Sequence, residues 1–276
     1  GSGETTLIGA TLNSGGDIAI AGDEGVTISA LQTQSMDFHQ HKKSSTFGLE
    51  KTDRGQAAQS TQLHAFSSTS GGHTQLYSGR NLKLIAADVQ AQGDINLEAV
   101  DQLLIAAGEV LHSHDQWSET SKAFSGGHVY ESEQHRSGQT VASHQASTLI
   151  AGGQINGQMG EGHIAGSDLH GSQGIDLLAD SANIRVEASQ TNVSRYQFDR
   201  TITVGFGDVA ENLSRPDEWV ETKDGRATVK LANADYAQSQ SDNTALSHRN
   251  AQLTSDDSIN LNAQTGAIEL VGTDII

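Results

Sequence analysis

The chain repeats a pair of very short aliphatic alternations, and this repeat restricts the possible folds more than any other feature. In "SQGIDLLADSANIRVEA", residues 172–188, Ile175 and Leu177 form one alternation, and Ile184 and Val186 form the next one shortly after it. Matching pairs occur in "GDIAIAGDEGVTISA", "GDINLEAVDQLLIAA" and "DSINLNAQTGAIELVG". The first aliphatic residues of the four copies recur at long and similar steps along the chain: Ile18, Ile95, Ile175 and Ile259.

A further aliphatic residue lies six positions before each of these four anchors: Leu12, Val89, Leu169 and Leu253. The stretch from Leu12 to Ile28 therefore holds three strand-like pieces, which is the length of about one turn of a three-sided coil. Strands this short are stable when coils stack and pair them in parallel. The sequence predicts an all-β fold, a right-handed parallel β-helix (solenoid) continuous over residues 1–276. An antiparallel sandwich is the weaker alternative, because four triplets match in register.

Composition agrees with a narrow core and excludes several partners. Only 4% of residues are aromatic, and all twelve aromatics fall outside the periodic triplets, which predicts that they form a layer apart from the core. The chain has no cysteine and a formal charge of −18, so we expect no disulfide, and neither nucleic acid nor anionic lipid as a partner. No apolar run approaches the roughly 20 residues of a membrane span. Both ends look cut from a longer protein.

Long polar stretches separate the triplets, at about 31–75, 108–148 and 189–250. In the third, residues 196–206 alternate apolar and polar side chains, as a half-buried strand does, and a second alternation follows at 227–236. We expect these two to pair as a hairpin over 195–237, with the single proline, Pro216, in its tip. The first two stretches are predicted to be related, more polar hairpin arms.

The segments "GGDIAIAG", "GDINLEA", "LLIAAGEV" and "GIDLLADSANIRVEASQT", each pair followed by a polar arm, resemble the haemagglutinin repeats of two-partner-secretion exoproteins, the filamentous haemagglutinin family. That family includes effectors of contact-dependent growth inhibition. The resemblance implies a fibre that is secreted through an outer-membrane partner and acts as an adhesin or carries a toxin at its tip. "LIAGGQINGQMGEGHIAGSDL" departs from the pattern by an extra glycine-rich piece.

Two kinds of chemical site are suggested by the polar residues. "HQH" (His39, His41) and "HSHD" (His112, His114 and Asp115) place pairs of histidines on one side of a strand, where each pair could share an ion such as zinc. No third metal ligand is identifiable, and solvated histidines explain them more simply. Polysaccharide-cleaving β-helices use clustered carboxylates, yet the candidates lie far apart and mostly in turns. They are Asp94, Glu98 and Asp101 in one copy, and Asp256, Asp257 and Glu269 in another.

The leading hypothesis is a non-catalytic, cofactor-free fibre segment of a secreted bacterial surface protein. It would serve toxin delivery into target bacteria or adhesion, through a protein, glycan or lipid receptor on a neighbouring cell. A polysaccharide-cleaving or polysaccharide-binding β-helix is the alternative. Aromatic side chains on the arms are the predicted contact surface. They are Trp117, Phe124, Tyr130, Tyr196, Phe198, Phe206 and Trp219.

Overall fold

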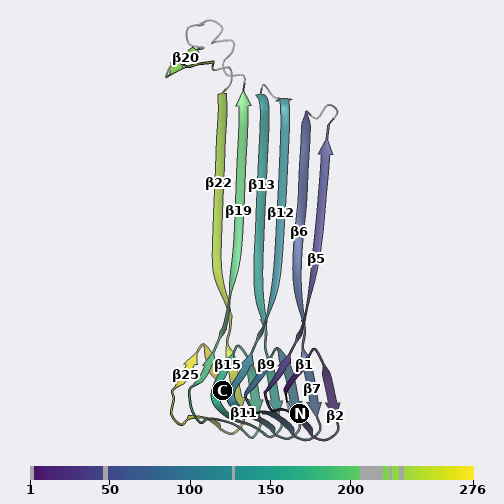
Figure 1. The fold of residues 1–276 in the computed structure, drawn as a ribbon, viewed down its shortest axis with the longest axis vertical. Helices are drawn as coiled ribbons and strands as arrows, with labels where there is room; N and C mark the ends of the chain where they lie inside the picture. The colour runs from purple at the N-terminus through teal and green to yellow at the C-terminus, as the bar shows by residue number, and fades with distance from the viewer. Residues whose placement is uncertain (1–2, 46–48, 126–127, 206–219, 224–225, 230–232) are drawn as a thin grey trace.

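The computed structural model describes residues 3–45, 49–125, 128–205, 220–223, 226–229 and 233–276, and within these ranges all regular structure is β-strand. Short strands stack in parallel into a solenoid, and six long strands stand off one side of it (Figure 1). The described fold is therefore a parallel β-helix, as the sequence predicts.

The solenoid has three sides, each a stack of parallel strands. The first side consists of β2 (Thr11–Ser14), β7 (Phe66–Ser70), β10 (Ala87–Ala91), β14 (Thr148–Ala151), β16 (Asp168–Gly171), β23 (Ala251–Ser255) and β26 (Thr273–Ile275). The second consists of β3 (Ile18–Gly22), β8 (Thr74–Ser78), the first parts of β11 (Ile95–Ala106) and β15 (Gln154–Ala165), β17 (Gly174–Ala179) and β24 (Ile259–Ala263). The third consists of β1 (Glu4–Ile8), β4 (Gly25–Ser29), β9 (Asn81–Ile85), the second parts of β11 and β15, β18 (Ile184–Glu187) and β25 (Ile268–Val271).

The core consists of columns of inward side chains, one residue from each coil. One column runs through Leu7, Ile28, Leu84, Ile105, Ile164, Val186 and Leu270. Its members from Ile28 to Val186 are at most 1% exposed, whereas Leu270 at the last coil is 46% exposed. Each interior aliphatic is thus removed from water by the coils on both sides, which is the favourable term that holds a solenoid together.

Two coils lie between those that the sequence predicts, at residues 66–85 and 148–165. Residues that pair in neighbouring coils show how much chain one coil uses: Ser68 pairs with Val89 in the next coil, and Leu149 pairs with Leu169. Each coil thus uses slightly more chain than the predicted stretch from Leu12 to Ile28. The first hidden coil puts Ser68 and Thr74 at core positions where its neighbours have aliphatics, so the aliphatic pattern is lost.

The second hidden coil is the glycine-rich piece that departs from the repeat. Gly157 and Gly162 occupy core positions beside Leu97 and Leu103. A Cβ at Gly157 would lie 2.8 Å from the Met159 methyl carbon, and a Cβ at Gly162 would lie 2.8 Å from the Met159 sulfur. The flexible Met159 side chain therefore fills both gaps, which is how methionine commonly serves irregular cores.

Phe66 corrects the prediction that every aromatic lies apart from the core. It opens β7 and is completely buried in the solenoid. Residues 66–70 and 74–78 form the solenoid strands β7 and β8. The first arm, predicted at about 31–75, therefore ends at His64, the last residue of its second long strand. Serine and threonine occupy core positions near Phe66, so the aliphatic pattern that would identify this coil in the sequence is missing.

The arms are antiparallel strand pairs: β5 (Leu31–Ser44) with β6 (Glu50–His64), β12 (Gly108–Ser125) with β13 (His128–Gln145), and β19 (Ser189–Gly205) with β22 (Asn233–Arg249). They join edge to edge into one six-stranded sheet in the order β22-β19-β13-β12-β6-β5, which we call the arm sheet (Figure 1). Its strands are longer and more numerous than those of isolated hairpins.

The third arm pairs differently from the prediction. Residues 196–204 pair with 234–242, so only the end of the expected partner segment is used. Residues 226–229 instead form β21 (Arg226–Val229), paired with β20 (Val220–Lys223). Pro216 lies outside the described residues.

One corner of the solenoid decides whether the chain continues into the next coil or leaves as an arm. The residues at this corner follow one another along a ladder of backbone hydrogen bonds. Gly9, Ala86, Gly166 and Gly272 have φ of +56°, +48°, +54° and +61°, and the chain proceeds directly to the next coil. Between them lie Ala30, Ala107 and Ala188, none with positive φ, and each precedes an arm strand. Arms therefore leave from every second coil.

Side-chain contacts at the base fix the arm sheet to the solenoid. Arg249, at the end of β22, donates a hydrogen bond to Asp168 of the coil strand β16. Thr191 of β19 donates to the Glu109 carboxylate of β12, which joins two neighbouring arms.

The corner geometry predicts a specific cost for Gly166→Ala. The added Cβ would lie 2.2 Å from Ser189 Oγ at a φ of +54°, so we expect the free energy of unfolding to fall by about 1 to 3 kcal/mol. Urea denaturation followed by far-UV circular dichroism measures it. Gly16→Ala is the control, because its Cβ meets nothing within 4 Å. Equal effects of both substitutions would refute the corner argument.

Phe66→Ala should lower the free energy of unfolding by about 3 to 5 kcal/mol, because it leaves a cavity beneath the first arm. Phe124→Ala removes a ring that is 68% exposed and should change stability by less than about 0.5 kcal/mol. The same denaturation assay compares the two. A small loss for Phe66→Ala would contradict its placement in the core.

Candidate functional site

The arm sheet is the candidate site because both of its faces lie outside the solenoid core. Directly opposite residues of antiparallel strands point to the same face, and successive residues alternate. Trp117 is opposite Gly55 and Arg136, and Arg136 is opposite Phe198. The register therefore assigns every arm residue outside irregular positions to one of two faces.

One face, which we call the aromatic face, carries all the paired aromatic residues of the described arm strands. Met36, Tyr236 and Leu246 on it are 76%, 62% and 68% exposed. The aromatics are Phe38, Trp117, Tyr130, Tyr196, Phe198 and Tyr236.

The opposite face, which we call the histidine face, is polar. It carries His39, His41, His64, His112, His114 and His135. The paired histidines of "HQH" and "HSHD" do share a side, but among the described residues no group of three or more His, Asp or Glu could hold a metal ion. His135 hydrogen-bonds Asp199 across the strands, and this bond is the main reason that the pKa of Asp199 is lowered.

The predicted contact residues do not all lie together. Trp117, Tyr130, Tyr196 and Phe198 are on the aromatic face. Phe124 is at the far end of β12 with a φ of +55° and has no opposite partner in the ladder. Phe206 and Trp219 lie outside the described residues. Sequence reasoning passed over Phe38 and Tyr236 as contact residues, because only the register shows that they share a face with Trp117.

The centre of the aromatic face is a shallow depression of about 330 Å³. Phe38 and Trp117 contact each other there, with ring centroids 5.6 Å apart. The Tyr196 hydroxyl donates to Asp115 Oδ1 at 3.2 Å. Partial burial, and next the Asp115 carboxylate, raise the pKa of Tyr196. The depression is lined by Ala57, Asp115, Gln116, Trp117, Arg136 and Tyr196.

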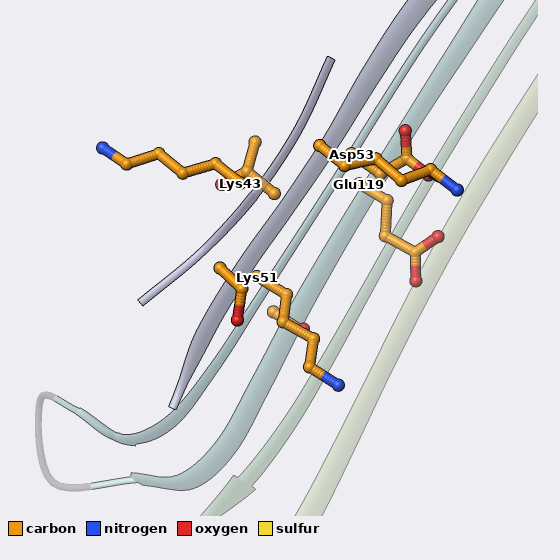
Figure 2. Close-up of a pocket in the computed structure, with 8 residues that line it drawn as sticks. Lys43, Lys51, Asp53 and Glu119 are labelled. Atoms are coloured by element: carbon orange, nitrogen blue, oxygen red, sulfur yellow. Dashed lines mark ion pairs between the residues drawn. The ribbon is translucent and has the colours of Figure 1, made fainter. Parts of the chain in front are cut away.

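A second depression, of about 430 Å³, lies toward the far end of the first arm. Figure 2 shows that Lys43 extends away from Lys51, Asp53 and Glu119, in agreement with its place on the histidine face. Lys42 Nζ lies 3.4 Å from Asp53, which also accepts hydrogen bonds from Gln40. The carboxylates thus offset the lysines, and the depression has no excess charge of one sign to select a ligand.

Three of the six carboxylates considered for catalysis have structural partners. Asp94 accepts a hydrogen bond from the Gln154 backbone amide, and Asp101 lies 3.5 Å from Arg80. Glu269 lies 3.9 Å from Arg185. The two groups are separated by three coils, roughly 14 Å along the axis, so they do not form one site.

The comparisons with known proteins give one match. The family model described as "Hemagglutinin repeat" matches residues 1–119, which span the first three complete coils, the first arm and the start of the second. No curated protein and no solved structure matches the chain. No helix among the described residues is long and apolar enough to span a membrane.

Tyr196 predicts a pH dependence. A raised pKa means that the folded protein keeps the phenol proton longer than the unfolded chain, so stability falls as pH rises above the ordinary tyrosine pKa of about 10. Tyr196→Phe should reduce this fall, measured as urea midpoints at about pH 9 and 11. Asp115→Asn should lower the Tyr196 pKa, seen by phenolate absorbance. An unchanged phenolate titration in Asp115→Asn would contradict the contact.

Proposed function

We propose that the chain is a non-catalytic fibre segment of a large secreted bacterial surface protein. The proposal starts from residues 1–119, which match the hemagglutinin repeat and form a haemagglutinin-repeat region of the filamentous haemagglutinin type. The solenoid supplies a stiff rod, because parallel backbone pairing runs along its whole length. The parent protein would reach the cell surface through an outer-membrane secretion partner.

The observation that carries a contact role is the arm sheet itself. A soluble sheet usually buries one face against another layer, yet here the aromatic face lies open along the long arm strands. Exposed apolar side chains of this extent commonly mark an interaction surface. Tyr196 and Phe198 belong to the arm sheet and do not belong to the solenoid core, which supports a contact role for the third arm.

Two kinds of contact fit this surface: adhesion to a neighbouring cell, and help in passing a toxin into a target bacterium. Delivery would use amphipathic hairpins with open edges, and β5 and β22 are the outer strands of the arm sheet. In either case the receptor is a protein, glycan or lipid on the surface of the neighbouring cell.

A polysaccharide-binding solenoid is the second candidate. Asn96, Asn156 and Asp176 stack in register on its outer surface and line a depression of about 430 Å³. Asn156 donates to Asn96 at 3.1 Å, so part of this ladder satisfies its own hydrogen bonds. The aromatic face of the arm sheet has more side-chain surface without a partner than this ladder does. We therefore favour the aromatic face as the contact surface.

Removal of the third arm tests the contact role. The turn at Gly166 shows how an armless coil closes, so deletion of residues 189–250 together with Ala188→Gly should keep the solenoid. We expect labelled protein to bind isolated bacterial outer membranes at least tenfold more weakly after this deletion.

Ile150→Ser, which removes an exposed apolar side chain from the solenoid, is the control and should bind normally. Arm-dependent binding to animal cells in place of bacterial membranes would favour adhesion. If the intact chain and the arm-deleted chain bind equally well, both to bacterial membranes and to animal cells, the contact role of this arm is overturned.

A further inference from the structure

Two aromatic rings lie flat on the arm sheet, each over a glycine of the neighbouring strand. A Cβ at Gly55 would lie 2.0 Å from Trp117 Cζ2 and 2.5 Å from both Cε2 and Cη2. Such similar distances mean that Gly55 lies under the face of the ring, since an edge-on approach would place the second and third atoms farther away. The other face of the Trp117 ring therefore points away from the sheet.

Tyr196 repeats the arrangement over Gly138. A Cβ there would lie 2.2 Å from Tyr196 Cε1 and 2.7 Å from Cζ, again a contact with the face of the ring, and 2.1 Å from Asp115 Oδ1, which accepts the hydrogen bond of the Tyr196 hydroxyl. Aromatic rings that cover glycines in neighbouring strands are a known device of β-sheets. Here the device leaves two planar apolar surfaces facing the solvent.

The two rings are spaced for an extended ligand. Gly55 is on β6 and Gly138 on β13, two strands away in the sheet, and their rows are offset by two positions along the strands. Strand spacing and rise put the covered glycines roughly 12 Å apart. This is the scale of every second sugar in an extended β-linked glycan, whose successive sugars alternate in orientation.

Polar groups of both kinds line the same depression as the two rings. Asp115 can accept hydrogen bonds, and Arg136, which is opposite Trp117, donates them. The small side chain of Ala57 leaves the floor of the depression low. A sugar needs such a surface, because it has an apolar C–H face and a rim of hydroxyl groups.

We propose that the aromatic face of the arm sheet binds an extended β-linked glycan chain, with alternate sugars on Trp117 and Tyr196 and the intervening sugar hydrogen-bonded by Asp115 and Arg136. The inference rests on the proposed contact role and names its ligand class. A second copy of the chain fits less well as the ligand. Its apolar face would remove Asp115 and Arg136 from water without offering them hydrogen-bond partners, which is costly. A lipid interior would impose the same cost.

The test is calorimetric titration of the full chain with three hexasaccharides: β-1,4-linked cellohexaose and chitohexaose, and α-1,4-linked maltohexaose. We expect a β-linked probe to bind and maltohexaose to bind at least tenfold more weakly, because its helical shape does not follow the two rings. Trp117→Ala and Tyr196→Ala should each weaken binding by about tenfold, whereas Trp117→Phe retains most of it.

Tyr77→Ala is the matched control, since it removes an exposed ring from the solenoid strand β8, outside the arm sheet. Circular dichroism establishes that each variant is folded. Absence of binding by every hexasaccharide, equal binding of α- and β-linked probes, or self-association that Trp117→Ala abolishes would each overturn the proposal. Arm-dependent binding to outer membranes without any glycan binding would leave the contact role intact and remove the glycan.

Discussion

The spacing between hydrogen-bonded β-strands, about 4.8 Å, sets the arrangement of the whole molecule. It is the rise of one coil along the solenoid and also the width of one strand in the arm sheet. An arm contributes two strands, so arms that pair edge to edge need two coils beneath each of them. The armless coils at 66–85 and 148–165 are required for this match.

The alternating corner is the local device that meets this requirement. A left-handed residue turns the chain directly into the next coil at Gly9, Ala86, Gly166 and Gly272, whereas the intervening corner alanines have no positive φ and lead into an arm. Glycine adopts positive φ without a steric penalty, whereas Ala86 is strained there and is held by a completely buried corner. The geometry of a few backbone angles thereby controls where the arm sheet appears.

The two layers divide the side chains by physical task. Aliphatic columns exclude water from a core that is too narrow for most rings, and Phe66 fits there because neighbouring core positions hold serine and threonine. Tyr77 lies on the outer surface of the solenoid strand β8, and the paired aromatics of the arm strands stand on the aromatic face, where they are available to a partner. A rod that is stabilised by its own coils can leave such a surface open, because its folding does not depend on burying it.

Local periodicity determined much of this fold. Aliphatic alternations with turn residues between them identify parallel coils, because each coil repeats the same environment, and the alternation from Tyr196 identifies a long strand. Two coils escaped detection because Ser68, Thr74, Gly157 and Gly162 replace aliphatics at core positions. In the second of these coils the Met159 side chain fills the gaps beside Gly157 and Gly162.

The candidate site depended on the tertiary structure. That Trp117, Tyr196 and Phe38 share one face follows from which residues are opposite one another in the arm sheet. Coil stacking sets that register by holding the base of each arm at a fixed height. The sequence alone determined that the chain would stack coils and carry polar arms, because those signals are local. Only the fold decided that the arms form one sheet with one aromatic face, because a shift of one residue in any arm would reverse its faces.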